Sequence, residues 1–298
     1  MEEYDIVIVG GGPAGLTAGI YAARAGKKVL VLEGKALGGQ IVNAPDVRNF
    51  PGIVAISGAD LAMNMYKQVQ EFGGEIKFER AMGIKDKVVY TDGGEYKAKA
   101  IILATGAENR RLGLYGEDRF VGKGVSYCAT CDGNFYKGKV VAVVGGGNTA
   151  LEDAVYLANI AKKVYLVHRR ETFRGDETNI EKVKACSNVE MILSANVREI
   201  LGEDKVSGLE IEVRDGERKT VDVDGVFFAI GYVPQANEFA DSVAIDKDGY
   251  IKTKDGIHTS TDGIYVAGDA RAKELRQLVT AAADGAIAAS VAVKEMES

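Results

Sequence analysis

Asp5-Ile6-Val7-Ile8-Val9-Gly10-Gly11-Gly12-Pro13-Ala14-Gly15 joins a short apolar run to a glycine-rich turn. The β-branched run predicts a buried parallel strand, and the small and apolar residues 16–25 predict a helix after the turn. Gly10 permits the tight turn, Gly12 lets the backbone approach a pyrophosphate, and Gly15 lets the helix pack closely against the strand. This order of strand, glycines and helix predicts a dinucleotide-binding βαβ unit.

The acid at the end of this unit indicates which nucleotide it binds. Residues 28–32 predict the second strand, and Glu33 ends it about twenty residues beyond the glycines. A carboxylate at this position accepts hydrogen bonds from a ribose diol and repels a 2′-phosphate. We therefore expect FAD or NAD at the first site, and not NADP.

The same pattern occurs again further along the chain, with the opposite charge at its end. Residues 140–144 predict a strand, Gly145-Gly146-Gly147-Asn148-Thr149-Ala150 follows it, and residues 163–167 predict the second strand. His168-Arg169-Arg170 then stands where the first unit has its acid, and Arg174 follows closely. Arginines here clamp a 2′-phosphate through charge-assisted hydrogen bonds, although a solvated basic turn would have the same composition. We favour the clamp and expect NADP.

Two cysteines, Cys128 and Cys131, lie between the two nucleotide signatures. Such a pair serves as half of a zinc site, as a structural disulfide or as a redox-active dithiol. A zinc site needs further ligands, and Cys186, His168 and His258 are not spaced to supply them. A structural disulfide across so short a loop would stabilise the fold little. We therefore predict a redox dithiol and no metal site. We interpret Cys186 as a half-buried spectator and His258 as a surface or turn residue.

The bulk composition narrows the class of protein. At 298 residues the chain suits two domains, and its 46% hydrophobic and 27% charged content is ordinary for a globular protein. The formal net charge of -6 argues against a nucleic-acid-binding protein. No apolar run reaches the roughly 20 residues that span a bilayer, so we expect no membrane partner. The acidic N-terminal residues are unlike a signal peptide, so we expect a cytoplasmic protein.

The two sites and the dithiol together predict a path for electrons. Hydride from NADPH delivers an electron pair, a disulfide accepts one, and a flavin is the natural carrier between them. We expect electrons to pass from NADPH to FAD, then to the Cys128–Cys131 pair and on to an external acceptor. The second domain has to present both its nicotinamide and its cysteines to one flavin. We therefore predict that it rotates about two connecting strands.

At this point the chain resembles the low-molecular-weight thioredoxin reductases over nearly its whole length. The motifs that match, in family order, are residues 10–15, Gly39-Gln40, Asn49-Phe50-Pro51-Gly52, Cys128-Ala129-Thr130-Cys131-Asp132-Gly133, residues 145–150, His168-Arg169-Arg170 with Arg174, Gly268-Asp269 and Arg276-Gln277.

The resemblance implies a role for each residue of the dithiol motif. Cys131 is expected to lie near the flavin, and Cys128 to attack the disulfide of thioredoxin. Asp132 is expected to act as the general acid/base, although an aspartate here would also serve as a helix cap. Asp269 resembles the acid that holds the ribityl chain, and Arg276-Gln277 the segment beside the flavin ring. The family also implies a homodimer with non-covalently bound FAD.

The fold class that we expect is α/β, with two three-layered, Rossmann-like nucleotide-binding domains and the second inserted into the first. The FAD domain is expected over residues 1–112 and 239–298, and the NADPH domain over residues 113–238, with a boundary in the polar, glycine-rich segment 113–124. The predicted FAD contacts are Gly10, Gly12, Pro13, Ala14, Gly15, Glu33, Gly34, Gly39, Gln40, Asn49, Thr105, Gly106, Gly268, Asp269, Arg276 and Gln277. The predicted NADPH contacts are Gly145, Gly147, Asn148, Thr149, His168, Arg169, Arg170, Arg174, Ile230 and Gly231.

Departures from the family pattern leave alternatives open. Asn148-Thr149 stands where many members have Asp-Ser, and we expect a changed NADPH contact there, not a lost site. Relatives that take electrons from ferredoxin, or that act as dithiol oxidases, lack the arginines that this chain has. The partner is expected to be thioredoxin, with a glutaredoxin-like protein as the alternative. A reductase that feeds a peroxidase would have an extra N-terminal dithiol domain, and a non-catalytic flavin-binding switch would not turn NADPH over.

Overall fold

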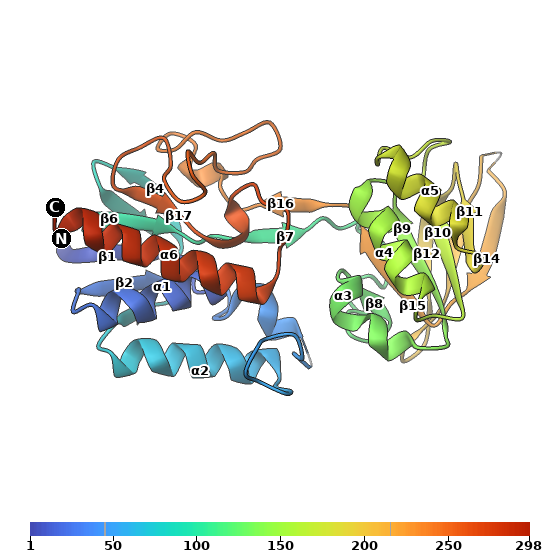
Figure 1. Cartoon of the computed structure of the whole chain (residues 1–298), viewed down its shortest axis with the longest axis horizontal. Helices are drawn as coiled ribbons and strands as arrows, with labels where there is room; N and C mark the ends of the chain where they lie inside the picture. Colours follow the sequence, from blue (N-terminus) through green and yellow to red (C-terminus); the bar gives the residue numbers. More distant parts are fainter. Residues whose placement is uncertain (45, 215) are drawn as a thin grey trace. The chain divides into compact units, whose positions relative to one another are not determined.

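The computed structural model describes residues 1–44, 46–214 and 216–298 (Figure 1). The chain forms two compact units: unit 1 comprises Met1–Glu108 and Val233–Ser298, and unit 2 comprises Asn109–Tyr232. The chain passes between the units through β7 (Ala107–Asn109) and β16 (Tyr232–Pro234), which pair with each other. Unit 2 is therefore an insertion in unit 1.

Unit 1 is built around a largely parallel sheet. In the described residues the strand order is β3-β2-β1-β6-β5-β4, and β17 also pairs with β6. Strands β1, β2, β3, β6 and β17 run parallel, whereas β4, β5 and β6 form antiparallel pairs. The elements of unit 1 are β1 (Glu2–Val9), α1 (Pro13–Arg24), β2 (Val29–Leu32), η1 (Gly39–Asn43), α2 (Gly58–Glu71), β3 (Glu75–Lys77), β4 (Ala81–Lys85), β5 (Val88–Thr91), β6 (Glu95–Leu103), η3 (Asn237–Phe239), β17 (Ile264–Val266), η4 (Gly268–Ala270) and α6 (Leu278–Met296).

Unit 1 has a hydrophobic core on each face of its sheet, because apolar side chains of its strands point alternately to the two faces. Ile6 and Ile8 of β1 pack with residues of α1, α2 and α6. Figure 1 shows α6 across the middle of this unit, with α1 and α2 below it. Val7 and Val9 pack on the opposite face with residues of the segment that follows β16. Because successive side chains of a strand point to opposite faces, a strand that is apolar throughout is covered on both.

Unit 2 also has a central parallel sheet between two layers, but the elements that pack on its faces are different. In the described part of the chain its parallel sheet has the order β11-β10-β9-β15-β8, and β12, β13 and β14 form a separate antiparallel sheet. Helices α4 and α5 cover one face of the parallel sheet and the antiparallel sheet covers the other. The elements of unit 2 are β8 (Val125–Ser126), α3 (Ala129–Asp132), η2 (Gly133–Tyr136), β9 (Val140–Gly145), α4 (Asn148–Ala158), β10 (Lys163–Val167), α5 (Glu177–Ala185), β11 (Val189–Ile192), β12 (Asn196–Gly202), β13 (Val206–Glu212), β14 (Arg218–Asp222) and β15 (Gly225–Ala229).

The expected α/β class with two Rossmann-like domains is confirmed, and the differences from expectation are local. The segment 113–124 lies inside unit 2, where buried Glu117 accepts hydrogen bonds from the backbone N–H groups of Gly113 and Leu114. Helix α2 begins at Gly58, where the side chain of the preceding residue caps it: Ser57 Oγ accepts a hydrogen bond from Asp60 N–H. Within the residues that the structure describes, no helix has the length and apolar character needed to cross a membrane.

Candidate active site

The first glycine loop forms a cradle at the N-terminus of α1. A Cβ at Gly10 would lie 2.3 Å from the Ala104 carbonyl oxygen, and one at Gly15 would lie 1.8 Å from the Gly10 carbonyl oxygen. A Cβ at Gly12 would meet no described heavy atom within 4 Å. Among the described residues no side chain caps α1 and no acid lies in its first turn. Free N–H groups and the positive end of the helix dipole therefore remain for an anion.

Glu33 is held beside this cradle by the backbone. Its side chain is 8% exposed, and Oε2 accepts a hydrogen bond from Gly11 N–H at 2.8 Å while Oε1 accepts one from Lys35 N–H at 2.6 Å. Gly38 N–H donates to the Gly11 carbonyl at 2.7 Å, which brings Gly39 against Gly12. Each carboxylate oxygen keeps a further lone pair, so a ribose hydroxyl can add to it.

Asp269, in the C-terminal segment of unit 1, belongs to a network of ion pairs that includes buried side chains. Lys273 Nζ lies 2.9 Å from Asp269 Oδ1 and 3.2 Å from Asp284 Oδ2, and its side chain is only 6% exposed. Arg271 pairs with Asp284 Oδ1 at 2.7 Å, and Gly268 N–H donates to Asp284 Oδ2 at 3.1 Å. Sequence reasoning missed Lys273 and Asp284. The two residues are eleven positions apart, in a loop and in a helix, and no local sequence pattern indicates that they pair.

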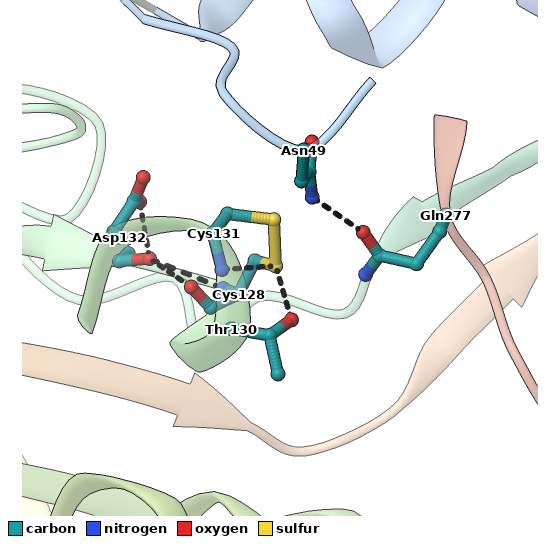
Figure 2. The surroundings of a disulfide bond; sticks show 7 residues. Asn49, Cys128, Thr130, Cys131, Asp132 and Gln277 are labelled. Carbon is teal, nitrogen blue, oxygen red and sulfur yellow. Dashed lines mark hydrogen bonds between the residues drawn. A yellow bond between two sulfur atoms is a disulfide. The ribbon is translucent and has the colours of Figure 1, made fainter. Parts of the chain in front are cut away.

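Further predicted FAD residues belong to unit 1, and two of them, Thr105 and Gly268, lie at the cradle. Thr105 follows β6, and its buried Oγ1 has no hydrogen-bond partner among the described residues. Gly268 contacts α1, since a Cβ there would lie 2.8 Å from Ala14 Cβ. Asn49 donates a hydrogen bond to Gln277 Oε1 at 3.0 Å (Figure 2). An unsatisfied buried hydroxyl beside a glycine cradle and an uncapped helix fits a dinucleotide.

The second glycine loop has the same geometry in unit 2. A Cβ at Gly145 would lie 2.3 Å from the Ala229 carbonyl oxygen, whereas one at Gly147 would meet no described heavy atom within 4 Å. Within the described chain, α4 also lacks a side-chain cap and an acid in its first turn. Ile230 is half-buried after β15, and Gly231 follows with φ +102°. The two units thus each have a helix N-terminus that is suited to binding an anion.

His168 occupies in unit 2 the position that Glu33 occupies in unit 1. It is 5% exposed, and its ring lies so close to Gly146 that a Cβ there would be 2.1 Å away. Its Nε2 contacts the Thr172 carbonyl at 3.2 Å, and its ring stacks on Phe173 with centroids 5.3 Å apart. Burial lowers the pKa of His168; the contact with Thr172 partly offsets this, and the neighbouring arginines lower the pKa further. A neutral His168 therefore packs beneath the turn that carries the arginines and supports its conformation.

The arginines themselves are exposed on this shaped turn. Arg174 N–H donates to the Gly146 carbonyl at 2.7 Å, so the backbone of the turn is tied to the glycine loop. Arg169, Arg170 and Arg174 all have exposed side chains, and none of them forms an ion pair with another described residue. Their charges are available to an anion bound beside the glycine loop.

Asn148 joins the two helices of this site. Its Nδ2 donates to Asp176 Oδ2 at 2.8 Å and its Oδ1 accepts from Asp176 N–H at 2.7 Å, so the N-terminus of α5 is tied to that of α4. An aspartate at position 148 would bring two carboxylates together here, which explains why an amide suits this chain. Thr149 beside it is exposed.

The two cysteines form a disulfide at the start of α3. Cys128 is the N-cap of this short helix, and Cys131 N–H points to Cys128 Sγ at 3.2 Å. Thr130 Oγ1 lies 3.4 Å from the same sulfur (Figure 2). Cys131 is exposed and Cys128 is half-buried, so an exchanging partner has access to the bond.

Asp132 follows the disulfide and bonds to Ser126, not to a helix end. Its Oδ2 accepts a hydrogen bond from Ser126 Oγ at 2.6 Å. In the described structure its side chain does not cap η2, which disfavours the alternative role as a cap. Burial raises the pKa of Asp132, and the hydrogen bond from Ser126 opposes this shift. A half-buried carboxyl group beside a disulfide is suited to proton transfer with thiols.

Comparison with known proteins places this geometry in a family. Residues 4–285 match the family model described as pyridine nucleotide-disulphide oxidoreductase. A thioredoxin reductase of Listeria monocytogenes is 42% identical over 300 residues, which cover 99% of this chain and 94% of the relative. The chain belongs to this family, among the low-molecular-weight thioredoxin reductases.

Solved structures agree with the assignment of this oxidoreductase to that family. A thioredoxin reductase from Streptococcus pyogenes has a TM-score of 0.93 and 41% identity, covering 99% of this chain and 98% of the other. One from Giardia duodenalis has a TM-score of 0.93 and 38% identity, with both chains fully covered. Membership of this family implies the use of a flavin and a pyridine nucleotide.

Proposed function

We propose that this protein transfers electrons from NADPH, through FAD, to the Cys128–Cys131 disulfide, and from the resulting dithiol to thioredoxin. The observation that supports this most is the accessible disulfide in a unit that also has an arginine-bearing nucleotide cradle. The relatives named thioredoxin reductase match nearly the whole chain, which supports thioredoxin over a glutaredoxin-like partner.

We assign FAD to unit 1. The uncapped N-terminus of α1 would hold the pyrophosphate, Glu33 the ribose, and Thr105 and Asp269 would supply polar groups to the remainder of the cofactor. When bound, the flavin would accept an electron pair from the nicotinamide and pass it to the disulfide. Within unit 1, the tie between Asn49 and Gln277 orders the segment that the family resemblance assigns to the flavin ring.

We assign NADPH to unit 2. The uncapped N-terminus of α4 would bind the pyrophosphate, and Arg169, Arg170 and Arg174 would bind the 2′-phosphate. The absence of an acid at position 168, where unit 1 has Glu33, removes the group that would repel a phosphate. This assignment also argues against ferredoxin as the donor, because ferredoxin requires no arginine clamp.

The dithiol would reduce thioredoxin by exchange, with atoms and electrons balanced. The Cys128 thiolate attacks one sulfur of the thioredoxin disulfide, forms a mixed disulfide and releases the other sulfur as a thiolate. The Cys131 thiolate then attacks Cys128 Sγ, which restores the Cys128–Cys131 disulfide and releases the second thioredoxin sulfur. Asp132 would take the proton of the attacking thiol and return it to a leaving thiolate. The enzyme dithiol loses one electron pair, and thioredoxin gains it.

We further propose a homodimer and a rotation of unit 2 about β7 and β16 between the half-reactions. Exposed apolar side chains on two neighbouring helices of unit 1 support the dimer: Tyr21 on α1 is 45% exposed and Ile287 on α6 is 50% exposed. Light scattering of the purified protein measures the assembly directly. A monomeric mass would refute this part of the proposal.

Steady-state turnover tests the function. We expect the FAD-loaded protein to oxidise NADPH only when oxidised thioredoxin is present, and Cys128→Ser to abolish thioredoxin reduction. Cys186→Ser, which removes the cysteine outside the motif, should leave the rate unchanged. Air-free NADPH consumption that does not depend on thioredoxin or on Cys128 would refute the proposal.

A further inference from the structure

The buried hydroxyl of Ser126 links Asp132 to the backbone of Cys128. Ser126 is the last residue of β8 and is 4% exposed. Its Oγ donates to Asp132 Oδ2 at 2.6 Å and accepts from Cys128 N–H at 3.1 Å. The side chain therefore spans the redox motif from one end to the other, although the sequence alone assigned it no role.

The hydroxyl is able to serve both protonation states of Asp132. It has one proton and two lone pairs, and Cys128 N–H occupies one lone pair. The proton has a second acceptor within reach, the Cys128 carbonyl oxygen at 3.4 Å. When Asp132 is ionised, Ser126 donates to it in a charge-assisted bond. When Asp132 is protonated, the acid donates to the second lone pair of Ser126, whose own proton turns to the carbonyl.

We propose that Ser126 is a positioning residue, whose hydroxyl holds the Asp132 carboxyl group beside the disulfide and sets the pH at which that group exchanges its proton. The proposal rests on the proposed function, in which Asp132 exchanges protons with the thiols. Burial raises the pKa of Asp132 and the Ser126 bond opposes it, which is the direction that the geometry requires. Losing the hydroxyl leaves burial unopposed.

The pH profile of thioredoxin reduction tests this role. In Ser126→Ala we expect the kinetic pKa assigned to Asp132 to move upward by about one unit, the size of shift that loss of a charge-assisted hydrogen bond produces. Ser126→Thr keeps the hydroxyl and should keep the wild-type value. If the alanine variant does not fold, the threonine variant decides alone, and a shifted pKa in it would overturn the proposal.

Two further variants separate positioning from a general structural effect. In an Asp132→Asn background, Ser126→Ala should cause no further change in the profile, because Ser126 acts through Asp132. Thr259→Val removes an equally buried hydroxyl from unit 1, where Thr259 is 2% exposed, and should not move the profile. An unshifted Ser126→Ala profile, or the same shift in Thr259→Val, would overturn the proposal.

Infrared titration of the Asp132 carboxyl group keeps this test independent of turnover. The C=O band of the protonated acid, identified by its loss in Asp132→Asn, should persist to higher pH in Ser126→Ala than in the wild type. If the protein failed to reduce thioredoxin but the band still shifted, the proposed function would be wrong and the Ser126 proposal would stand. A band that titrates at the same pH in both proteins would refute the role of Ser126.

Discussion

At the scale of single residues, Arg169 and Arg170 give the proposed nucleotide site of unit 2 a positive charge where that of unit 1 has the acid Glu33. They follow His168, whose buried ring packs on Gly146 as Glu33 packs on Gly11. One loop therefore ends in an acid and the other in cations, on otherwise equivalent cradles. We propose that the choice of nucleotide at each site follows from that contrast in charge.

Replacing both arginines tests this contrast. In Arg169→Ala plus Arg170→Ala we expect the KM for NADPH to rise by about 10- to 100-fold, with KM for NADH nearly unchanged, since charge-assisted bonds to a 2′-phosphate are lost. Arg198→Ala, which removes a cation paired with Glu212 on the antiparallel sheet, should leave both constants unchanged. An unaltered ratio of NADPH to NADH in the double variant would contradict the clamp.

The residues predicted from sequence are those with a local pattern, and the ones that were missed have distant partners. The spacing of glycines, arginines and cysteines follows from a nearby backbone shape, so Gly10, Gly145 and Cys128 stand out in the sequence. Ser126 is a neighbour of the motif, but its bond to Asp132 depends on how α3 turns back. Lys273 is buried, and it contacts Asp269 four residues before it and Asp284 eleven residues after it. Only the folded helix α6 brings Asp284 near.

At the scale of elements, the C-terminal end of α6 is tied to the loop before β17 through His258. The two ring nitrogens of His258 contact Asp255 Oδ2 at 2.6 Å and Glu295 Oε1 at 2.7 Å, and Tyr265 also donates to Glu295. These carboxylates raise the pKa of His258 above its usual value, Glu295 first. The pKa values of Asp255 and Glu295 are lowered, chiefly by hydrogen bonds. This role of His258 could not be predicted from the sequence, because its partner Glu295 lies 37 residues away.

This tie predicts a pH-dependent stability. Because the pKa of His258 is raised by folding, its contribution is complete below about pH 6.5 and is lost as pH rises through the folded value. The carboxylates have lowered values, so their contribution is lost only in acid. Glu295→Gln should therefore lower the free energy of unfolding more at pH 6 than at pH 9, by about 0.5 kcal/mol for this exposed pair. Equal differences at both pH values, by denaturant titration, would rule the tie out.

At the scale of the whole molecule, a glycine with positive φ precedes each of the two strands that connect the units. Gly106, at φ +71°, precedes β7 and its carbonyl accepts Gln235 N–H at 3.0 Å within unit 1. Gly231, at φ +102°, precedes β16 and its carbonyl accepts Arg110 N–H at 2.9 Å within unit 2. Backbone of this kind favours glycine and would suit a segment whose dihedral angles change during the rotation that we propose.

Gly231→Ala tests whether these connections limit turnover. A side chain at this φ costs about 1–2 kcal/mol, so we expect kcat to fall by about tenfold while the visible absorption of bound flavin stays unchanged. Gly83→Ala is the matched control, because its Cβ would have no neighbour nearer than 3.7 Å. A normal kcat with a raised KM for NADPH would assign Gly231 to nucleotide binding alone and contradict a role in rotation.

The central claim is that the flavin and then the disulfide accept electrons, and anaerobic titration with NADPH tests it by counting the equivalents consumed per flavin. Each group takes one electron pair, so the FAD-loaded wild type should consume about two equivalents of NADPH per flavin before reduction is complete. Cys128→Ser should consume about one, because its disulfide is gone, yet Cys131 should still perturb the flavin spectrum. A wild-type endpoint at one equivalent, identical to that of Cys128→Ser, would mean that the cysteines take no electrons from the flavin and would contradict the account.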